Sequence, residues 1–205
     1  MQNILDRLVA RLAKDGAALT FRPGVDDAAL DAAEAQLGHP LTPSLRALLR
    51  VANGQATPPQ YEPGAIHLFP ADMRLYSLKR IVSEHASQAE SHSDEGYDDL
   101  VADDAVRCVS WHSGRVPFAG AADSAWLWID HVPGPGGSAG QVLYNTSEVD
   151  MALMGASVED FLRRYLDALD SGALVVTHNE DEVFMVHADG RDPTEDWYDV
   201  LCVAE

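Results

Sequence analysis

The sequence predicts an α+β fold in which an antiparallel-rich sheet is covered by helices. Two neighbouring features carry this prediction. Residues 125–130 and 141–145 are β-prone runs on either side of a proline- and glycine-rich turn, which is typical of a β-hairpin. An amphipathic helix beginning at Ser157 follows the hairpin and offers an apolar face to cover it. At 205 residues the chain is long enough to bury a sizeable core.

Two helices are expected at the start of the chain. Apolar residues recur at helical spacing over residues 4–14, and Gly16 is expected to end this first helix. Asp26 is the expected N-cap of the second helix, because its carboxylate can accept a hydrogen bond from the first turn. Gly38 is expected to end that helix, since glycine readily adopts the left-handed backbone of a helix C-terminus.

A third helix, a short strand and a fourth helix are expected next. Residues 42–51 begin with a threonine cap followed by proline, which favours the first helical position. The pair Asn53-Gly54 predicts a turn after this helix. Residues 66–69 predict a short strand, and Ser77 is the expected cap of another amphipathic helix.

Strands are expected on the N-terminal side of the hairpin, and a capped helix on its C-terminal side. Residues 106–111 and 116–119 are short β-prone runs that predict two strands. Ser157 and Asp160 stand three residues apart and form an approximate capping box, with Asp in the place of the usual Glu. Gly172 is the expected C-terminal stop of this helix.

The C-terminal tail also has β character. Residues 174–176 and 183–186 are β-prone runs joined by the polar turn 179–181, so they predict a second hairpin. We therefore expect one domain over residues 1–172 and a C-terminal acidic β extension over residues 173–205, packed on the same domain.

The net charge of −19 at pH 7 limits the partners of this protein. Binding of nucleic acid depends on lysines and arginines that neutralise phosphates, so no nucleic-acid partner is expected. The same charge disfavours docking on anionic membranes, and no apolar run is long enough to span a bilayer. A basic protein partner is compatible with this charge.

The negative charge is concentrated in two segments. Residues 81–106 contain eight acids and no lysine or arginine, and residues 179–205 contain nine acids and Arg191, so each segment carries −8. Aromatic residues lie among these acids, as is typical of interface anchors. The sequence thus predicts a partner-binding surface made of Glu90, Asp94, Glu95, Tyr97, Asp98, Asp99, Asp103, Asp104, Glu195, Asp196, Trp197 and Tyr198.

Two other interpretations of the acidic segments stay open. The acids can form a solvated surface or a mobile loop that keeps the protein soluble. They can also bind a cation, although they lack the alternating spacing and the glycine register of a calcium loop.

No sequence motif indicates catalysis, a metal ion or a cofactor, so none of the three is expected. His85 and His92 would share a helix face, but no HExxH motif is present. The glycine-rich run 133–140 lacks the lysine of a phosphate-binding loop and precedes a strand instead of a helix. Cys108 and Cys202 form no CxxC pair and are expected to be free thiols in a reducing cytoplasm, unless the fold brings them together in a disulfide. The first residues lack the features of a secretory signal, so a cytoplasmic location is expected.

The aromatic strand of the hairpin allows two interpretations. Trp126 and Trp128 alternate with Leu127 and Ile129, so the two pairs face opposite sides of the sheet. Either both faces are packed, or the tryptophans line a ligand groove. Asp130 at the end of this strand either caps a turn, which we favour, or anchors a partner.

Four motifs in sequence order carry a family resemblance. They are DAALDAAEAQLGHPLTPSLRALLRVANG at 27–54, VPFAGAADSAWLWID at 116–130, GGSAGQVL at 136–143 and ASVEDFLRRYLDAL at 156–169. Together they resemble the SUKH superfamily, which groups bacterial immunity proteins with fungal cell-wall regulators. The chain departs from the family pattern at Thr42, which separates the usual Leu-Pro pair, and at Val158, which replaces a phenylalanine.

The resemblance implies a SUKH-like α+β domain with a binding role. The first functional hypothesis is a cytoplasmic immunity protein that binds and neutralises a cognate bacterial toxin by stoichiometric occlusion. The second hypothesis is a regulatory protein-binding scaffold without a toxin partner. An unrecognised hydrolase is the third hypothesis, because acids abound and their positions in space are not given by the sequence.

Overall fold

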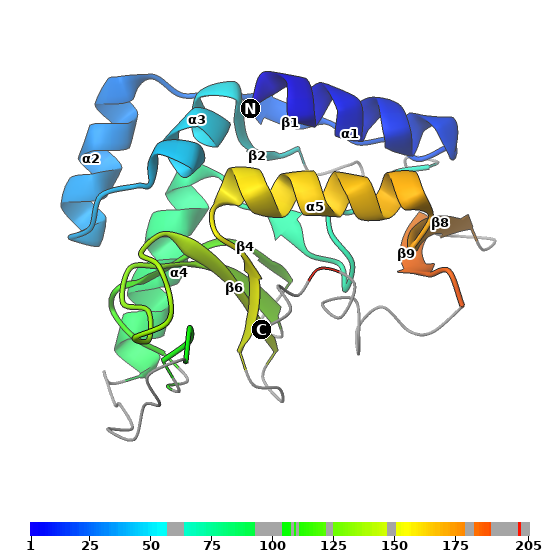
Figure 1. Ribbon diagram of the computed structural model, residues 1–205. Helices are drawn as coiled ribbons and strands as arrows, with labels where there is room; N and C mark the ends of the chain where they lie inside the picture. Colours follow the sequence, from blue (N-terminus) through cyan, green and yellow to red (C-terminus); the bar gives the residue numbers. More distant parts are fainter. Residues whose placement is uncertain are drawn as a thin grey trace.

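The computed structural model describes residues 1–56, 64–92, 104–107, 109, 111–121, 125–146, 151–178, 183–189 and 201. The fold is α+β, as the sequence predicts (Figure 1). The helices are α1 (Gln2–Lys14), α2 (Asp27–Leu37), α3 (Pro43–Val51), α4 (Leu78–Ser91) and α5 (Val158–Ser171). Within the described part of the chain, no helix has the length and apolar character that crossing a membrane requires.

The central sheet has five strands, paired antiparallel in chain order. They are β3 (Arg74–Leu75), β4 (Arg115–Ala121), β5 (Ala125–Asp130), β6 (Gln141–Thr146) and β7 (Ala152–Gly155). Two antiparallel pairs flank this sheet: β1 (Phe21–Pro23) with β2 (Ala52–Gln55), and β8 (Leu174–His178) with β9 (Val183–His187). The predicted central hairpin corresponds to β5 and β6, and the predicted second hairpin to β8 and β9, so both are confirmed.

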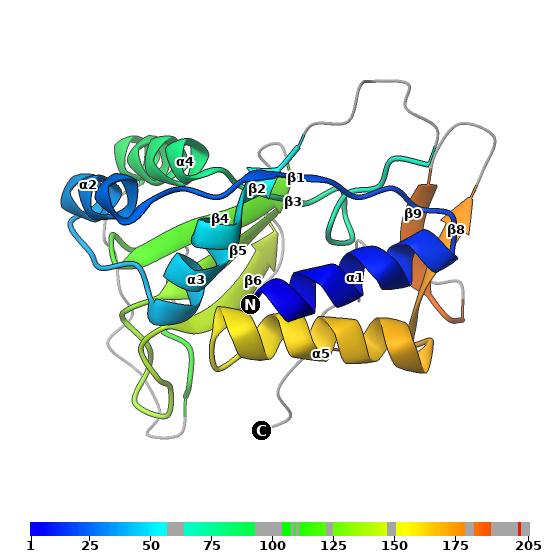
Figure 2. The ribbon, with the colours of Figure 1, turned by 90° about the horizontal axis from the view of Figure 1, so that it is seen from above.

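The two faces of the central sheet have different covers. Leu127 and Ile129 of β5 lie on the face that joins the main hydrophobic core with the helices, which we call the helical face. Trp128 of β5 and Leu143 of β6 lie on the opposite face, in a second cluster with Trp111; we call it the outer face. On the helical side α1 runs beside α5, so these two helices stack (Figures 1 and 2).

The helices begin where the sequence predicts, because their caps are local. Asp26 Oδ1 accepts a hydrogen bond from Ala29 N at 2.9 Å, and Thr42 Oγ1 accepts one from Leu45 N at 3.3 Å. The other two caps behave in the same way, with Ser77 Oγ accepting from Arg80 N and Ser157 Oγ accepting from Asp160 N. Asp160 Oδ2 in turn accepts from Ala156 N at 3.0 Å, which completes the predicted capping box one residue early.

The C-terminal ends of the helices are also determined by residues close in sequence. Gly38 after α2 and Gly172 after α5 have φ of 72° and 78°, the left-handed backbone expected of them. Helix α1 ends at Lys14, and Gly16 follows with φ of 78°.

The turn predicted at Asn53-Gly54 is wrong, because these residues belong to strand β2, which pairs with β1. Gly54 has φ of 83°, and a Cβ at this position would lie 2.5 Å from the backbone N of Ser77. Glycine is needed here for backbone conformation and for close approach, not for a chain reversal.

The strand predicted at residues 66–69 is also wrong. The side chain of Gln55 takes the place of a partner strand: its Nε2 donates to Ile66 O at 2.7 Å, and its Oε1 accepts from Leu68 N at 3.0 Å. Gln55 is buried, so this side chain satisfies backbone groups that a β-ladder would otherwise pair.

The strand predicted at residues 106–111 is absent from the residues described there, 106, 107, 109 and 111. The guanidinium of Arg115 donates to Arg107 O and to Val109 O, each at 2.6 Å. These carbonyls point to one side chain instead of a neighbouring strand, and Val109 N donates to Arg107 O at 2.9 Å.

The second hairpin packs on the end of α5. Leu174 and Met185 belong to the main core, and the hydroxyl of Tyr165 in α5 lies 2.6 Å from Leu68 O and 2.7 Å from Met185 Sδ. Burial raises the pKa of the Tyr165 hydroxyl, so it stays protonated and its one proton is shared between these two acceptors. The domain boundary placed at residue 172 stays a prediction.

Candidate functional site

Two of the twelve residues predicted to bind a partner lie in the described part of the chain. Glu90 is exposed in the last turn of α4, and Asp104 is half-buried next to the loop that joins β5 to β6. The other ten, Asp94, Glu95, Tyr97, Asp98, Asp99, Asp103, Glu195, Asp196, Trp197 and Tyr198, lie outside the described residues. The partner-binding surface therefore stays a prediction.

The first acidic segment has identifiable contacts on both sides of residues 93–103, which lie outside the described residues. Before them, the rings of His92 and Trp111 lie 6.5 Å apart with their planes at 26°. After them, Asp104 O accepts from Gly136 N at 3.0 Å, and Ala105 O accepts from Gly134 N at 3.1 Å. The glycine-rich loop thus binds the C-terminal end of this segment.

Glycine is required in that loop by close approach. A Cβ at Gly134 would lie 2.3 Å from Asp104 O, and a Cβ at Gly137 would lie 2.2 Å from Ala105 O. Both distances are too short for a side chain, so the loop can bind this backbone only because the side chains are missing. This explains the glycines that the sequence analysis left without a role.

Asp130 serves the turn, as we favoured, and its side chain is fully buried. Its Oδ1 accepts from Val132 N at 3.1 Å, and its Oδ2 accepts from the side-chain amide of Gln141 at 3.0 Å. Arg115, also fully buried, brings its Nε to 3.6 Å from Oδ1. Asp130 is therefore not available to anchor a partner.

The packed interpretation of the tryptophans is confirmed for Trp128. Trp128 is 2% exposed, and its Nε1 donates to Asn145 Oδ1 at 2.6 Å. Trp126 is half-buried, lies against Trp128 and donates its Nε1 to Glu84 Oε1 at 3.2 Å. The outer face at these residues is a second small core, not a groove lined by indoles.

Glu84 is an acid of the first segment that does not contribute to its surface. Its side chain is 4% exposed, and Arg80 pairs with it at 2.6 Å from one helical turn away. The spacing of Arg80 and Glu84 is the sequence signal that could have shown this pairing.

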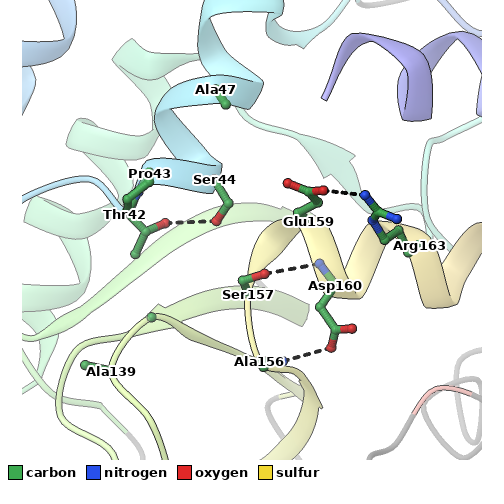
Figure 3. Close-up of a pocket in the computed structure, with 11 residues that line it drawn as sticks. Thr42, Pro43, Ser44, Ala47, Ala139, Ala156, Ser157, Glu159, Asp160 and Arg163 are labelled. Atoms are coloured by element: carbon green, nitrogen blue, oxygen red, sulfur yellow. Dashed lines mark hydrogen bonds and ion pairs between the residues drawn. The ribbon is translucent and has the colours of Figure 1, made fainter.

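The described part of the chain also contains an open groove of about 580 Å³ that the sequence analysis missed. The N-terminal ends of α3 and α5 face this groove together with the end of the β5–β6 loop that leads into β6 (Figure 3). Its lining consists of small, hydroxyl-bearing and charged residues: Thr42, Pro43, Ser44, Ala47, Ala139, Gly140, Ala156, Ser157, Glu159, Asp160 and Arg163. The sequence signals both helix caps but not that the two caps meet.

The polar groups of the groove are already engaged with one another. Arg163 pairs with Glu159 at 2.6 Å, and this hydrogen bond lowers the pKa of the Glu159 carboxyl. Asp160 accepts from Ala156 N and from Arg164. The groove therefore offers hydroxyls and an ion pair for recognition, and no described pair in its lining combines a nucleophile with a histidine base.

Arginines on the helical side pair with acids outside the predicted surface. Arg46 of α3 binds Asp31 at 2.8 Å and Glu34 at 2.7 Å, and these two hydrogen bonds raise the pKa of its guanidinium. Arg50 binds Asp27 at 2.5 Å, and this hydrogen bond lowers the pKa of the Asp27 carboxyl. Within the α2–α3 pair, two arginines are thus paired with three acids.

The described residues contain no group of three His, Cys, Asp or Glu side chains placed to hold a metal ion. His85 uses its Nε2 to bond Ser113 O at 2.7 Å, and His92 uses its Nδ1 to bond Gln88 O at 3.2 Å. Both rings also pack near Trp111, so their shared helix face serves the second core.

Comparison with known protein families identifies a match. A family model described as the SMI1 / KNR4 family (SUKH-1) matches residues 24–164, from just before α2 into the middle of α5. No curated protein matches the chain. The matched region contains the central sheet, the groove and the first acidic segment, whereas α1 and the second hairpin lie outside it.

Proposed function

The chain belongs to the SMI1/KNR4 family (SUKH-1), and from this premise we propose that it is an immunity protein. It binds a cognate bacterial toxin stoichiometrically in the cytoplasm and occludes the toxin's active face. It acts by binding and has no catalytic role of its own. The partner is a basic protein, as in a polymorphic toxin system, and neither nucleic acid nor a membrane is part of the complex.

The observation that carries this proposal is the uneven distribution of charge. Of the net −19, the two acidic segments supply −8 each. The described arginines of α1, α3 and α5 pair with acids that belong to neither segment. Glu90 has no ion pair among the described residues, so its charge is available to attract a basic surface.

In the proposed complex, acidic residues attract the partner and aromatic residues anchor it. The acids of the two segments steer a basic toxin, which raises the association rate and makes it sensitive to salt. Tyr97, Trp197 and Tyr198 anchor the complex, because large aromatic side chains carry much of the energy of protein interfaces.

The test is co-expression with the toxin domain encoded beside this protein, followed by titration of the purified pair at low and high salt. We expect growth rescue and a one-to-one complex that weakens as salt increases. A toxic neighbour that is neither bound nor neutralised contradicts the proposal. A non-toxic neighbour that binds equally well supports the alternative of a regulatory scaffold.

A matched pair of variants locates the surface. Asp98→Asn with Asp99→Asn removes two charges from the predicted surface, and Asp6→Asn with Asp167→Asn removes two exposed charges from α1 and α5. The first pair should weaken binding by about 0.2–1 kcal/mol per charge, and mostly at low salt. Equal effects of the two pairs would mean that net charge acts without a localised surface.

A further inference from the structure

Two histidines from distant parts of the chain stack on one another. His39 lies in the loop between α2 and α3, and His131 directly follows β5. Their ring centroids are 5.7 Å apart and the ring planes differ by 10°. The stack joins the α2–α3 loop to the loop between β5 and β6.

The environment of His131 favours its neutral form. The ring is half-buried, and its Nε2 is buried without a hydrogen-bond partner in the structure that surrounds it. Burial lowers the pKa of His131, and the charge of His39 lowers it further, whereas Asp130 acts in the opposite direction. In the charged ring both nitrogens carry a proton, and the proton on Nε2 would have no acceptor there, which disfavours the charged form.

The acids Asp130 and Glu34 near the stack already form ion pairs and hydrogen bonds with other groups. Asp130 is paired with Arg115 and bonded to Gln141, so only part of its charge acts on His131. Glu34, on the α2 side, accepts from Leu41 N and is paired with Arg46 at 2.7 Å. Arg107 also reaches this turn, with its Nε 3.4 Å from Val132 O.

We propose that the His39–His131 stack is a pH-sensitive contact between the α2–α3 loop and the β5–β6 loop. Neutral rings hold the two loops together, and protonation of His131 separates them because a charged ring is disfavoured at this half-buried position beside His39. This proposal does not depend on which partner the protein binds.

The same two loops line the groove, so separation of the stack changes the groove. Thr42 follows His39 by three residues, and Gly140 lies at the far end of the β5–β6 loop. The loops also approach each other closely here, because a Cβ added at Gly140 would lie 3.1 Å from Thr42 Cγ2. Protonation therefore widens the groove on the side formed by these residues.

The direction of the pH dependence follows from the lowered pKa of His131. The ordinary pKa of histidine is 6.5, and that of His131 in the folded state is lower. Above pH 6.5 the ring is neutral in the folded and in the unfolded state, so the contact has its full stability. As the pH falls from there through the lowered pKa, the unfolded or separated state takes up more protons and the contact is lost.

The experiment is a proton NMR titration of the histidine rings in the wild type, His39→Gln and the control His178→Gln. His178 bonds Asp15 O at 2.7 Å, on strand β8 and away from the stack. We expect the pKa of His131 to rise in His39→Gln and to stay unchanged in His178→Gln. An unchanged pKa of His131 in His39→Gln would overturn the stack as a coupled pair.

A second measurement tests the movement of the loops. In the wild type, the backbone amide signals of Thr42 and Gly140 should shift together with the pKa of His131, and His131→Gln should abolish this shift at both positions. Hydrogen exchange at Gly140 N, which bonds Asp130 O at 2.7 Å, should lose protection over the same range. Titration of His131 without any response at Thr42 and Gly140 would overturn the conformational part of the proposal.

Discussion

On the helical side of the central sheet, ion pairs lie at the surface, whereas on the outer face one ion pair is fully enclosed. Arg46 and Arg50 pair with acids of α2 that are mostly exposed, with Asp31 at 67% and Asp27 at 63% side-chain exposure. Arg115 and Asp130 are each 0% exposed. Breaking an exposed ion pair changes the stability of the fold little, because water replaces the lost partner. Breaking the buried pair leaves a charge without a partner and destabilises the fold much more.

The comparison shows where the fold depends on single residues. The α2–α3 network has several members, so water and neighbouring charges can replace each lost pair. The Arg115 guanidinium has no access to water and holds Asp130 together with the carbonyls of Arg107 and Val109. The chain just after the first acidic segment is therefore positioned by one buried side chain and by the glycine-rich loop.

The largest effect is expected from Arg115→Met. It leaves the Asp130 carboxylate buried without its cation and should cost about 3–5 kcal/mol of the free energy of unfolding, measured by urea denaturation. The double variant Arg115→Met with Asp130→Asn should recover part of this loss. A loss below about 1 kcal/mol, comparable to a surface pair, would remove the distinction between the two sides of the sheet.

Gly134→Ala should have the next largest effect on the free energy of unfolding. Its Cβ would lie 2.3 Å from Asp104 O, so the backbone after the acidic segment must move, at a cost of about 1–3 kcal/mol. Gly172→Ala is the control, because no atom lies within 4 Å of its Cβ and only the left-handed backbone opposes it, at about 1 kcal/mol. Urea denaturation gives both values, and equal losses would show that Asp104 is not held by close approach.

Ser157→Ala should have an intermediate effect on the helical side. It removes the hydroxyl that accepts from Asp160 N at 3.1 Å and should lower the free energy of unfolding by about 1 kcal/mol. Ser157→Asp keeps an acceptor at the cap and should restore most of the stability. Similar thermal midpoints for the wild type and Ser157→Ala would contradict the role of this cap.

The smallest effect is expected from Asp27→Asn at the surface network. The pKa of Asp27 is lowered by Arg50, so the pair stabilises the fold above the ordinary value of 3.8 and the stabilisation is lost as the pH falls through the lowered value. At neutral pH and low salt the variant should be slightly less stable than the wild type, with the difference fading in high salt. A difference that persists below the pKa of Asp27 would have to come from packing instead of charge.

Local features of the fold could be predicted from the sequence with few errors. Asp26, Thr42, Ser77 and Ser157 cap their helices as expected, because a cap and its acceptor groups lie within three residues of one another. The wrong predictions concern segments 53–54, 66–69 and 106–111, whose backbone is paired with strand β1, Gln55 or Arg115 from elsewhere in the chain. A short apolar run cannot show which partner its backbone will find.

The sequence by itself determined the α+β class, the helix ends, the charge of −19 and the family, since these depend on neighbouring residues, composition and ordered motifs. Only the tertiary structure decided that Glu84 and Asp130 are buried, that the caps of α3 and α5 share a groove, and that His39 meets His131. The groove and the histidine stack each join residues far apart in the chain. Burial and long-range pairing arise when helices pack on the sheet, and no local pattern encodes them.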